Sequence, residues 1–118
     1  IFVMETQYAL EVAQTILSQL RYTTDRNFMV MSWGSNKPIY GFDSLLGYEA
    51  PFLQFRVKGR LFSGRVRVYH NSLDYYTVFF MAVQSDTEKM PRLDDVDCEQ
   101  LTYAIDRAIE NPKGGYKY

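Results

Sequence analysis

The sequence is poor in the features that cross-link a chain, anchor it in a membrane or give it a strong charge. Cys98 is the only cysteine among 118 residues, so no internal disulfide can form and a disulfide-stabilised scaffold is excluded. The longest apolar run, residues 78–83, is much shorter than the ~18 residues that a membrane-spanning helix needs. The formal net charge of −1 is also unlike the positive charge of a typical nucleic-acid-binding domain. We therefore expect a cytoplasmic protein with no membrane partner.

What the sequence does contain is enough apolar material for one compact core. Hydrophobic residues make up 47% of the chain, and 18 of the 19 aromatic residues are Tyr or Phe. Disordered chains are poor in such residues, and 118 residues divided in two would leave each part too small for a good core. The prediction is one domain over residues 4–112, followed by a flexible C-terminal tail at residues 113–118. The three residues before Met4 are left out of this prediction.

Two segments near the ends of the chain have the period of an amphipathic helix. The first runs from about residue 5 to residue 22, and the second follows a polar loop predicted at residues 84–92. In each segment the apolar residues recur at i, i+3, i+4, i+7 and i+8, which places them on one face. These residues are Ala9, Val12, Ala13, Ile16, Leu17 and Leu20 in the first segment, and Leu101, Ala104, Ile105, Ala108 and Ile109 in the second. Asp94 or Asp97 is expected to cap the second helix, which Asn111 and Pro112 should end.

Between the helices the pattern changes to the alternation of β-strands. Strands are predicted at residues 28–33, 39–42, 52–58, 65–70 and 75–83, with Pro38 favouring a turn or a sheet edge. The third and fourth of these should form a hairpin with one buried and one solvated face. The fifth is apolar enough to lie centrally or to have both faces covered. The predicted fold class is α+β, in two layers, with an antiparallel meander of four to five strands and both terminal helices on one face.

Basic residues gather on the outward face of the predicted hairpin. The strand period places Arg56 and Lys58 on that face of one strand, and Arg65, Arg67 and Tyr69 on that face of the next. Arginines can hold phosphates while aromatic rings stack on bases, so these five residues are the candidate site for nucleic acid or for another partner. The alternative, which the near-neutral total charge favours, is a solvated face whose charges discourage edge pairing.

Carboxylates dominate a later segment, residues 86–99. They can cap the second helix and interact favourably with its dipole, and their spacing does not match that of an EF-hand loop. A basic segment and an acidic segment in one chain also permit head-to-tail self-association, which salt would weaken.

The residues that most often carry catalysis are scarce. His70 is the only histidine. Asp74 and Tyr75 are near it in the sequence, yet no recognised catalytic pattern joins them, so a structural role at a strand end is favoured. Cys98 has acidic neighbours that raise the pKa of a thiol and no matching histidine, so we expect a buried or half-buried small residue. No catalytic residue, metal site or cofactor is predicted.

Two stretches carry a resemblance to known sequences. Residues 23–27 lead into Ser32-Trp33-Gly34, and Cys98-Glu99-Gln100-Leu101 leads into Ile105-Asp106-Arg107. With these stretches the chain resembles, over most of its length, small uncharacterised α+β proteins of gut Bacteroidetes and of their phages or mobile elements. The resemblance implies a bacterial cytoplasm and a phage or mobile-element context. It implies no active site.

The sequence thus favours a non-enzymatic binding module that works with a protein partner or by self-association. Two alternatives stay open. One is a nucleic-acid-binding accessory domain that uses the basic and aromatic sheet face. The other is a small nuclease-like enzyme that uses His70 with neighbouring Arg and Tyr side chains.

Overall fold

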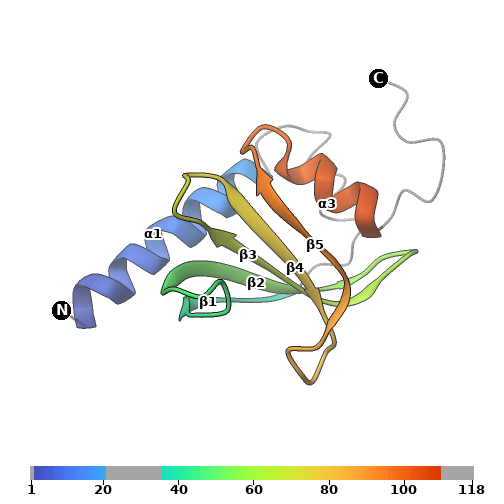
Figure 1. Ribbon diagram of the computed structural model, residues 1–118, viewed down its shortest axis with the longest axis horizontal. Helices are drawn as coiled ribbons and strands as arrows, with labels where there is room; N and C mark the ends of the chain where they lie inside the picture. Colours follow the sequence, from blue (N-terminus) through green and yellow to red (C-terminus); the bar gives the residue numbers. More distant parts are fainter. Residues whose placement is uncertain (1, 21–35, 110–118) are drawn as a thin grey trace.

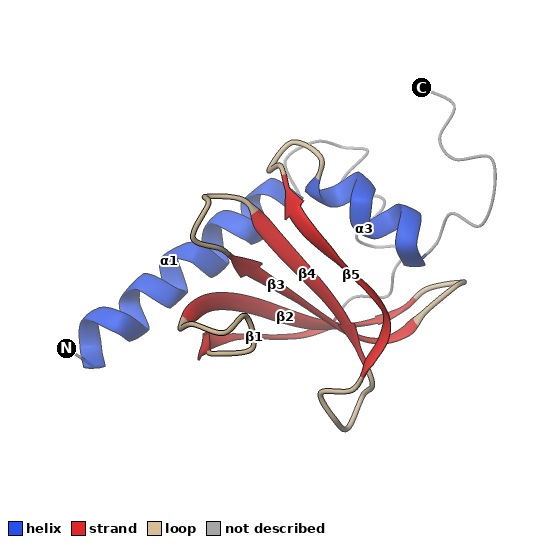
Figure 2. Cartoon of the chain, viewed as in Figure 1, coloured by secondary structure: helices blue, strands red, loops and turns tan. Residues whose placement is uncertain are grey.

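The computed structural model describes residues 2–20 and 36–109 as one sheet with two helices. Helix α1 (Phe2–Leu20) comes first, helix α3 (Leu101–Ile109) comes last, and the strands between them are β1 (Asn36–Asp43), β2 (Ala50–Lys58), β3 (Ser63–His70), β4 (Tyr76–Met81) and β5 (Glu88–Val96). The strands pair antiparallel in the order β1-β2-β3-β4-β5. Both helices lie on one face of the sheet (Figures 1 and 2), where their side chains join one core. The predicted α+β meander with two helices on one face is confirmed.

Some predicted elements fall outside the described residues. They are the strand at residues 28–33, the end of the second helix at Asn111 and Pro112, and the tail at residues 113–118. The first helix, predicted at about residues 5–22, spans Phe2–Leu20. Neither described helix is long and apolar enough to cross a membrane.

The main core lies between the helices and the sheet. Ala9, Ala13, Ile16 and Leu20 form the buried stripe of α1, each 2% exposed or less. Ala13, Ile16 and Leu20 of this stripe meet the side chains that alternate toward the helices along β2, β3 and β4, namely Leu53, Phe55, Val57, Val66, Val68, Tyr76, Val78 and Phe80. Leu101, Ile105 and Ile109 of α3 complete this core. The two helical periods and the strand alternation therefore assign these side chains correctly to one interior.

The turn between β2 and β3 packs against the end of α3. Its Gly59 lies so close to Ile109 that a Cβ at position 59 would overlap the Ile109 carbonyl oxygen. The Gly59 N–H donates to the Phe62 carbonyl at 2.8 Å, and the Leu61 N–H donates to the Ile109 carbonyl at 2.8 Å. The second bond satisfies one of the carbonyls that the end of a helix leaves without an intrahelical partner. The tip of the hairpin is therefore held in a fixed position on the helix.

The polar loop predicted at residues 84–92 is wrong over its second half. Residues from Glu88 onward form β5, which pairs with β4 at one edge of the described sheet. Pro91 has no N–H to donate, and an edge strand tolerates this. Register shifts along β4 place the half-buried Met90, Leu93 and Val96 at every third position of β5. The alternation that marks a strand in a sequence is consequently absent here.

The sheet face that points away from the helices is a second core, which corrects the prediction of a solvated hairpin face. Ala50, Phe52, Tyr69, Phe79 and Met81 are buried together there and pack against Leu46 of the β1–β2 loop. The Tyr69 ring makes edge contacts with the Phe52 and Phe79 rings, at centroid distances of 5.6 Å and 5.5 Å. Strand alternation assigns side chains to a face, but it does not say whether loops cover that face. β4, predicted to be central or covered, is buried on both faces.

Candidate functional site

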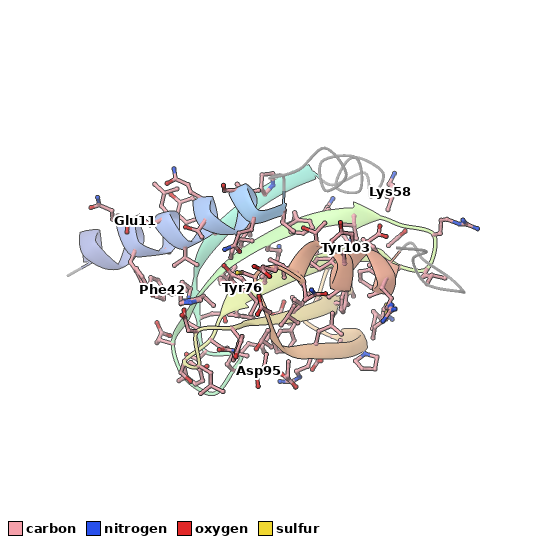
Figure 3. The ribbon with its side chains drawn as sticks, turned by 90° about the horizontal axis from the view of Figure 1, so that it is seen from above. Glu11, Phe42, Lys58, Tyr76, Asp95 and Tyr103 are labelled. Atoms are coloured by element: carbon pink, nitrogen blue, oxygen red, sulfur yellow. The ribbon has the colours of Figure 1, made fainter. Side chains whose placement is uncertain are left out.

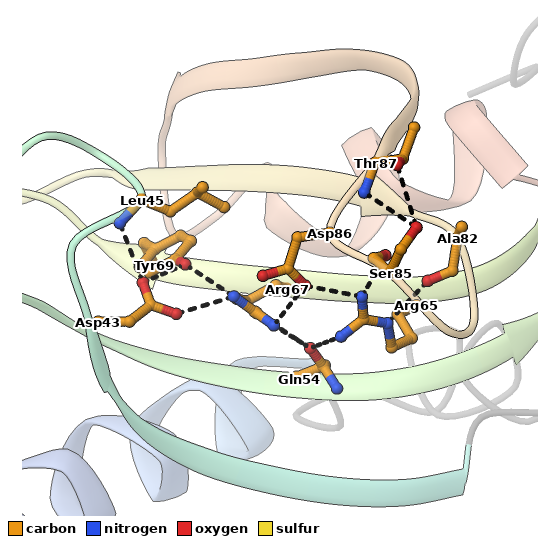
Figure 4. A network of polar contacts seen from close by, with 10 residues as sticks. All are labelled: Asp43, Leu45, Gln54, Arg65, Arg67, Tyr69, Ala82, Ser85, Asp86 and Thr87. Carbon is orange, nitrogen blue, oxygen red and sulfur yellow. Dashed lines mark hydrogen bonds and ion pairs between the residues drawn. The ribbon is translucent and has the colours of Figure 1, made fainter.

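A continuous set of hydrogen bonds and ion pairs crosses the second face of the sheet (Figure 4). We call it the arginine network, and its members are Asp43, Gln54, Arg65, Arg67, Tyr69 and Asp86. The β2–β3 register sets Gln54 directly opposite Arg67, so their side chains share this face. Asp43 comes from the end of β1 and Asp86 from the β4–β5 loop. The network therefore joins β1, β2, β3 and the loop after β4.

Arg67 lies buried at the centre of the arginine network. Its Nη1 donates to Asp43 Oδ2 at 2.8 Å and to the Tyr69 hydroxyl at 3.2 Å. Its Nε and Nη2 both donate to Gln54 Oε1, at 2.9 Å and 2.8 Å. The guanidinium carbon stands 4.8 Å from the centroid of the Phe52 ring, a favourable cation–π distance. Every guanidinium nitrogen of Arg67 thus has a partner within the domain.

Arg65 is bound in the same way at the edge of the network. Its Nη2 donates to Asp86 Oδ1 at 2.8 Å and its Nε donates to the Ala82 carbonyl at 2.8 Å. Its Nη1 reaches Gln54 Oε1 at 3.1 Å. Two arginines and two carboxylates give the network a formal charge of 2 − 2 = 0. Carboxylates of the domain itself therefore neutralise Arg65 and Arg67, which the sequence suggests as phosphate-binding residues.

The ion pair between Asp86 and Arg65 predicts that the stability of the domain falls modestly at acid pH. The hydrogen bond from Arg65 is the main reason that the pKa of Asp86 lies below its usual value. A carboxylate whose pKa is lower in the folded state stabilises the protein at pH values above its unfolded-state pKa of about 3.9. This stability is lost as the pH falls through the folded-state pKa. Because Asp86 is largely exposed, we expect only about 0.2–1 kcal/mol from it. Urea unfolding between about pH 6 and pH 3 should show a shallower loss of stability in Asp86→Asn than in the wild type; equal slopes would contradict this.

Tyr69 is enclosed by the second core. Burial is the main cause that raises the pKa of its hydroxyl. The hydroxyl donates to Asp43 Oδ1 and accepts from Arg67. Its ring, which is 0% exposed, lies between Phe52 and Phe79. A ring in this position has no face free for stacking on a base.

The structure brings three of the five predicted site residues together and separates the other two from them. Arg65, Arg67 and Tyr69 belong to the arginine network. Arg56 pairs with Arg65 across the β2–β3 ladder but is half-exposed, and Lys58 is exposed at the end of β2. Neither makes an ion pair within the part of the chain that the structure describes.

The remaining basic residues mark the turn that joins β2 to β3. We call this turn and the strand ends that carry its charges the basic hairpin, which contains Arg56, Lys58, Arg60 and Leu61. Arg60 is exposed at the tip, and Leu61 beside it is 50% exposed. Figure 3 shows Lys58 toward one end of the molecule and Glu11 of α1 toward the other. Arg56, Lys58 and Arg60, which make no ion pair among the described residues, therefore gather at this end of the sheet.

His70 lies at the opposite end of β3 beside a shallow hollow. Its Nε2 is 2.6 Å from Asp74 Oδ1, and its ring centroid is 5.9 Å from that of Tyr76. The hollow has a volume of about 230 Å³ and is lined by Tyr8, Glu11, Val12, Thr15, His70 and Tyr76. The Thr15 hydroxyl donates to the Glu11 carbonyl at 3.0 Å. His70 has a carboxylate partner, but none of the described residues that line this hollow is an activated nucleophile.

Cys98 lies in the turn that precedes α3. Its side chain is exposed, so the expectation of a buried or half-buried residue is wrong. Desolvation and the neighbouring Asp97 and Glu99 carboxylates raise the pKa of its thiol, which disfavours the nucleophilic thiolate. Asp97 shapes this turn by accepting a hydrogen bond from the Glu99 N–H at 2.8 Å. α3 then begins at Leu101.

Apolar and acidic side chains share the end of the sheet that contains His70. We call it the acidic end, which comprises the β1–β2 loop (44–49), the β3–β4 turn (71–75), the end of β5 (94–97) and residues 8–15 of α1. The Ser72 N–H donates to the Tyr48 hydroxyl at 2.9 Å, and Asn71 Nδ2 donates to Asp95 Oδ1 at 2.9 Å. These bonds hold the loop, the turn and β5 together.

Five of the nine large apolar side chains that are exposed among the described residues lie at the acidic end. They are Tyr8, Leu45, Tyr48, Leu73 and Tyr75. The carboxylates of the same end are Glu11, Glu49, Asp74, Asp94, Asp95 and Asp97, and its four segments contain no Lys or Arg. Sequence reasoning missed this surface because its members are spread over four segments. The only local signals were an apolar Leu73 within a turn and a run of tyrosines.

Comparisons of the chain with protein-family models, with curated proteins and with solved structures found no match. The resemblance to proteins of gut Bacteroidetes and their phages therefore stays a prediction. Within residues 2–20 and 36–109, no group of three or more His, Cys, Asp and Glu side chains is arranged to hold a metal ion.

Proposed function

We propose that this chain is a non-enzymatic protein-interaction module of a bacterium or phage, and that its acidic end binds a basic partner. The observation that carries the proposal is the gathering of exposed apolar side chains and carboxylates at one end of the sheet. Monomeric proteins rarely leave large apolar patches exposed, and tyrosine is enriched where partners bind. Carboxylates around such a patch favour a positively charged partner.

The β3–β4 turn supports the proposal because it presents Leu73 in an ordered position. Asn71 Oδ1 accepts hydrogen bonds from the N–H groups of Leu73 and Tyr75, at 3.0 Å and 3.1 Å. This arrangement is typical of an Asx turn, which needs no packing from the turn's own side chains. Position 73 is nevertheless occupied by an apolar leucine, which is 65% exposed. A turn whose backbone is already ordered lowers the entropy cost of binding.

The nucleic-acid alternative has less support than the protein partner. Arg65 and Arg67 would have to leave Asp86, Asp43 and Gln54 to reach phosphates. The acidic end, whose four segments contain six carboxylates and no Lys or Arg, would repel a polyanion.

A selection from a random peptide library tests the proposed function. We expect the wild-type domain to select peptides rich in Lys or Arg together with an aliphatic or aromatic residue. Leu73→Asp should weaken the binding of the selected peptides by about tenfold or more, because a desolvated apolar contact is lost. The added carboxylate does not repel a basic peptide, so charge repulsion is not the cause of the weakening.

Val83→Asp is the matched control, since Val83 is 41% exposed in the loop after β4, at the opposite end of that strand. This variant should bind the same peptides as the wild type does. Selection of no peptide, or equal weakening by both variants, contradicts a binding surface at the acidic end.

A further inference from the structure

The hollow beside His70 is a cavity of the acidic end whose lining residues indicate the kind of ligand group it would accept. Its volume of about 230 Å³ is below the range of about 300–1,000 Å³ that is usual for small-molecule sites. A single long side chain of a partner is a better match in size. Rings of Tyr8, His70 and Tyr76 contribute to its lining, and Tyr8 is 46% exposed.

The charges around the hollow select a cation. Glu11 lies on its wall and is exposed, and Asp74, bound to His70 at 2.6 Å, is 90% exposed. None of the six lining residues is Lys or Arg. Aromatic faces attract a guanidinium or ammonium group, and a carboxylate at the rim adds to this attraction. The fitting occupant is therefore a Lys or Arg side chain.

The chain itself carries such a side chain in a suitable setting. Arg60 stands exposed at the tip of the basic hairpin and has no ion-pair partner among the described side chains. Leu61 beside it is 50% exposed, so the tip offers one cation and one apolar group. The hydrogen bonds of Gly59 and Leu61 to Phe62 and Ile109 already fix the shape of the tip. Little backbone freedom of the tip therefore remains to be lost when it binds.

We propose that the hollow of one copy receives the basic hairpin of a second copy, with Arg60 against Glu11. This inference rests on the proposed function, because it names the partner of the acidic end. Lys58 of the basic hairpin and Glu11 of the hollow lie toward opposite ends of the domain (Figure 3), so one copy cannot fill its own hollow. The contact joins two different surfaces, and repeated use of such a contact gives a ring or an extended chain of copies.

Sedimentation velocity of charge-swapped variants tests this assembly. At about 50 mM salt, the mean sedimentation coefficient of the wild type should rise between about 10 μM and about 500 μM protein, and about 500 mM salt should suppress the rise. Glu11→Arg and Arg60→Glu should each weaken association by about tenfold or more, because each sets like charges against one another.

An equimolar mixture of the two variants should associate again. Arg at position 11 of one variant then faces Glu at position 60 of the other, while the second contact in the mixture is the native one between Glu11 and Arg60. The recovery also shows that both variants are folded. Glu88→Arg, which makes the same change of charge at an exposed position of β5, should behave as the wild type does.

The outcomes separate this inference from the proposed function. A wild type that stays monomeric at every concentration and salt overturns the assembly, and so does association that survives Glu11→Arg or fails to return in the mixture. If peptides of a basic and apolar type still bind in a manner that depends on Leu73, the interaction module stands with a different partner. If that binding also fails, both proposals fall.

Discussion

Replacing Arg67 with alanine is expected to lower the free energy of unfolding by about 3 kcal/mol. Removal of one member of a buried ion pair typically costs about 3–5 kcal/mol, because the remaining charge and its hydrogen-bonding partners lose their compensation. Arg67 donates hydrogen bonds to Asp43, Gln54 and Tyr69, and its guanidinium group lies over the Phe52 ring. The lower end of the range applies because the Asp43 side chain remains 33% exposed and keeps access to water.

Urea denaturation followed by circular dichroism measures this effect, and Arg56→Ala is the matched control. Arg56 stands on the same face of the hairpin but is half-exposed and has no ion pair among the described residues. Its removal should change the free energy of unfolding by no more than about 0.5 kcal/mol. Equal effects of the two substitutions would mean that Arg67 is not committed to the fold, which would return it to the candidates for ligand binding.

Phe79→Ala is expected to destabilise the domain by about 3–5 kcal/mol, as much as Phe80→Ala. The two rings point to opposite faces of β4 and are 1% and 0% exposed. Phe80 belongs to the main core beneath the helices, and Phe79 belongs to the second core with Phe52, Tyr69 and Met81. Each truncation removes apolar contacts and leaves a cavity that the surrounding side chains fill only in part.

The comparison of the two phenylalanines tests whether the second face is a core. Tyr75→Ala, at an exposed position just before β4, provides the control and should cost less than about 1 kcal/mol. If Phe79→Ala costs as little as Tyr75→Ala while Phe80→Ala costs several times more, the face away from the helices is open to solvent. That result would restore the solvated face that the sequence predicts.

Most of the fold could be predicted because it depends on short-range periodicity. The stripes at Ala9–Leu20 and Leu101–Ile109, and the alternation along residues 52–58 and 65–70, each report which side of an element is buried. Sequential strands joined by short turns pair as neighbours, which yields the meander. β5 escaped prediction because bulges spread its half-buried residues to every third position and because Pro91 and the carboxylates suggest a loop.

The candidate site was predicted only in part, and for a physical reason. Alternation correctly placed Arg65, Arg67 and Tyr69 on one face. It held no information about Asp43 and Asp86, which lie 24 and 19 positions from Arg67 and yet neutralise the arginines. Whether an arginine is free for a ligand depends on such long-range partners, because a nearby carboxylate compensates its charge.

The sequence alone determined the fold class, the main core between the helices and the sheet, and the absence of an internal disulfide, since composition and local periodicity suffice for each. The tertiary structure decided which charges are free. It buried Arg67 within the arginine network, left Arg60 exposed at the tip of a turn, and gathered Tyr8, Tyr48 and Leu73 from three separate segments at one end. Free charge and exposed apolar surface depend on contacts between distant segments, and those contacts exist only once the chain is folded.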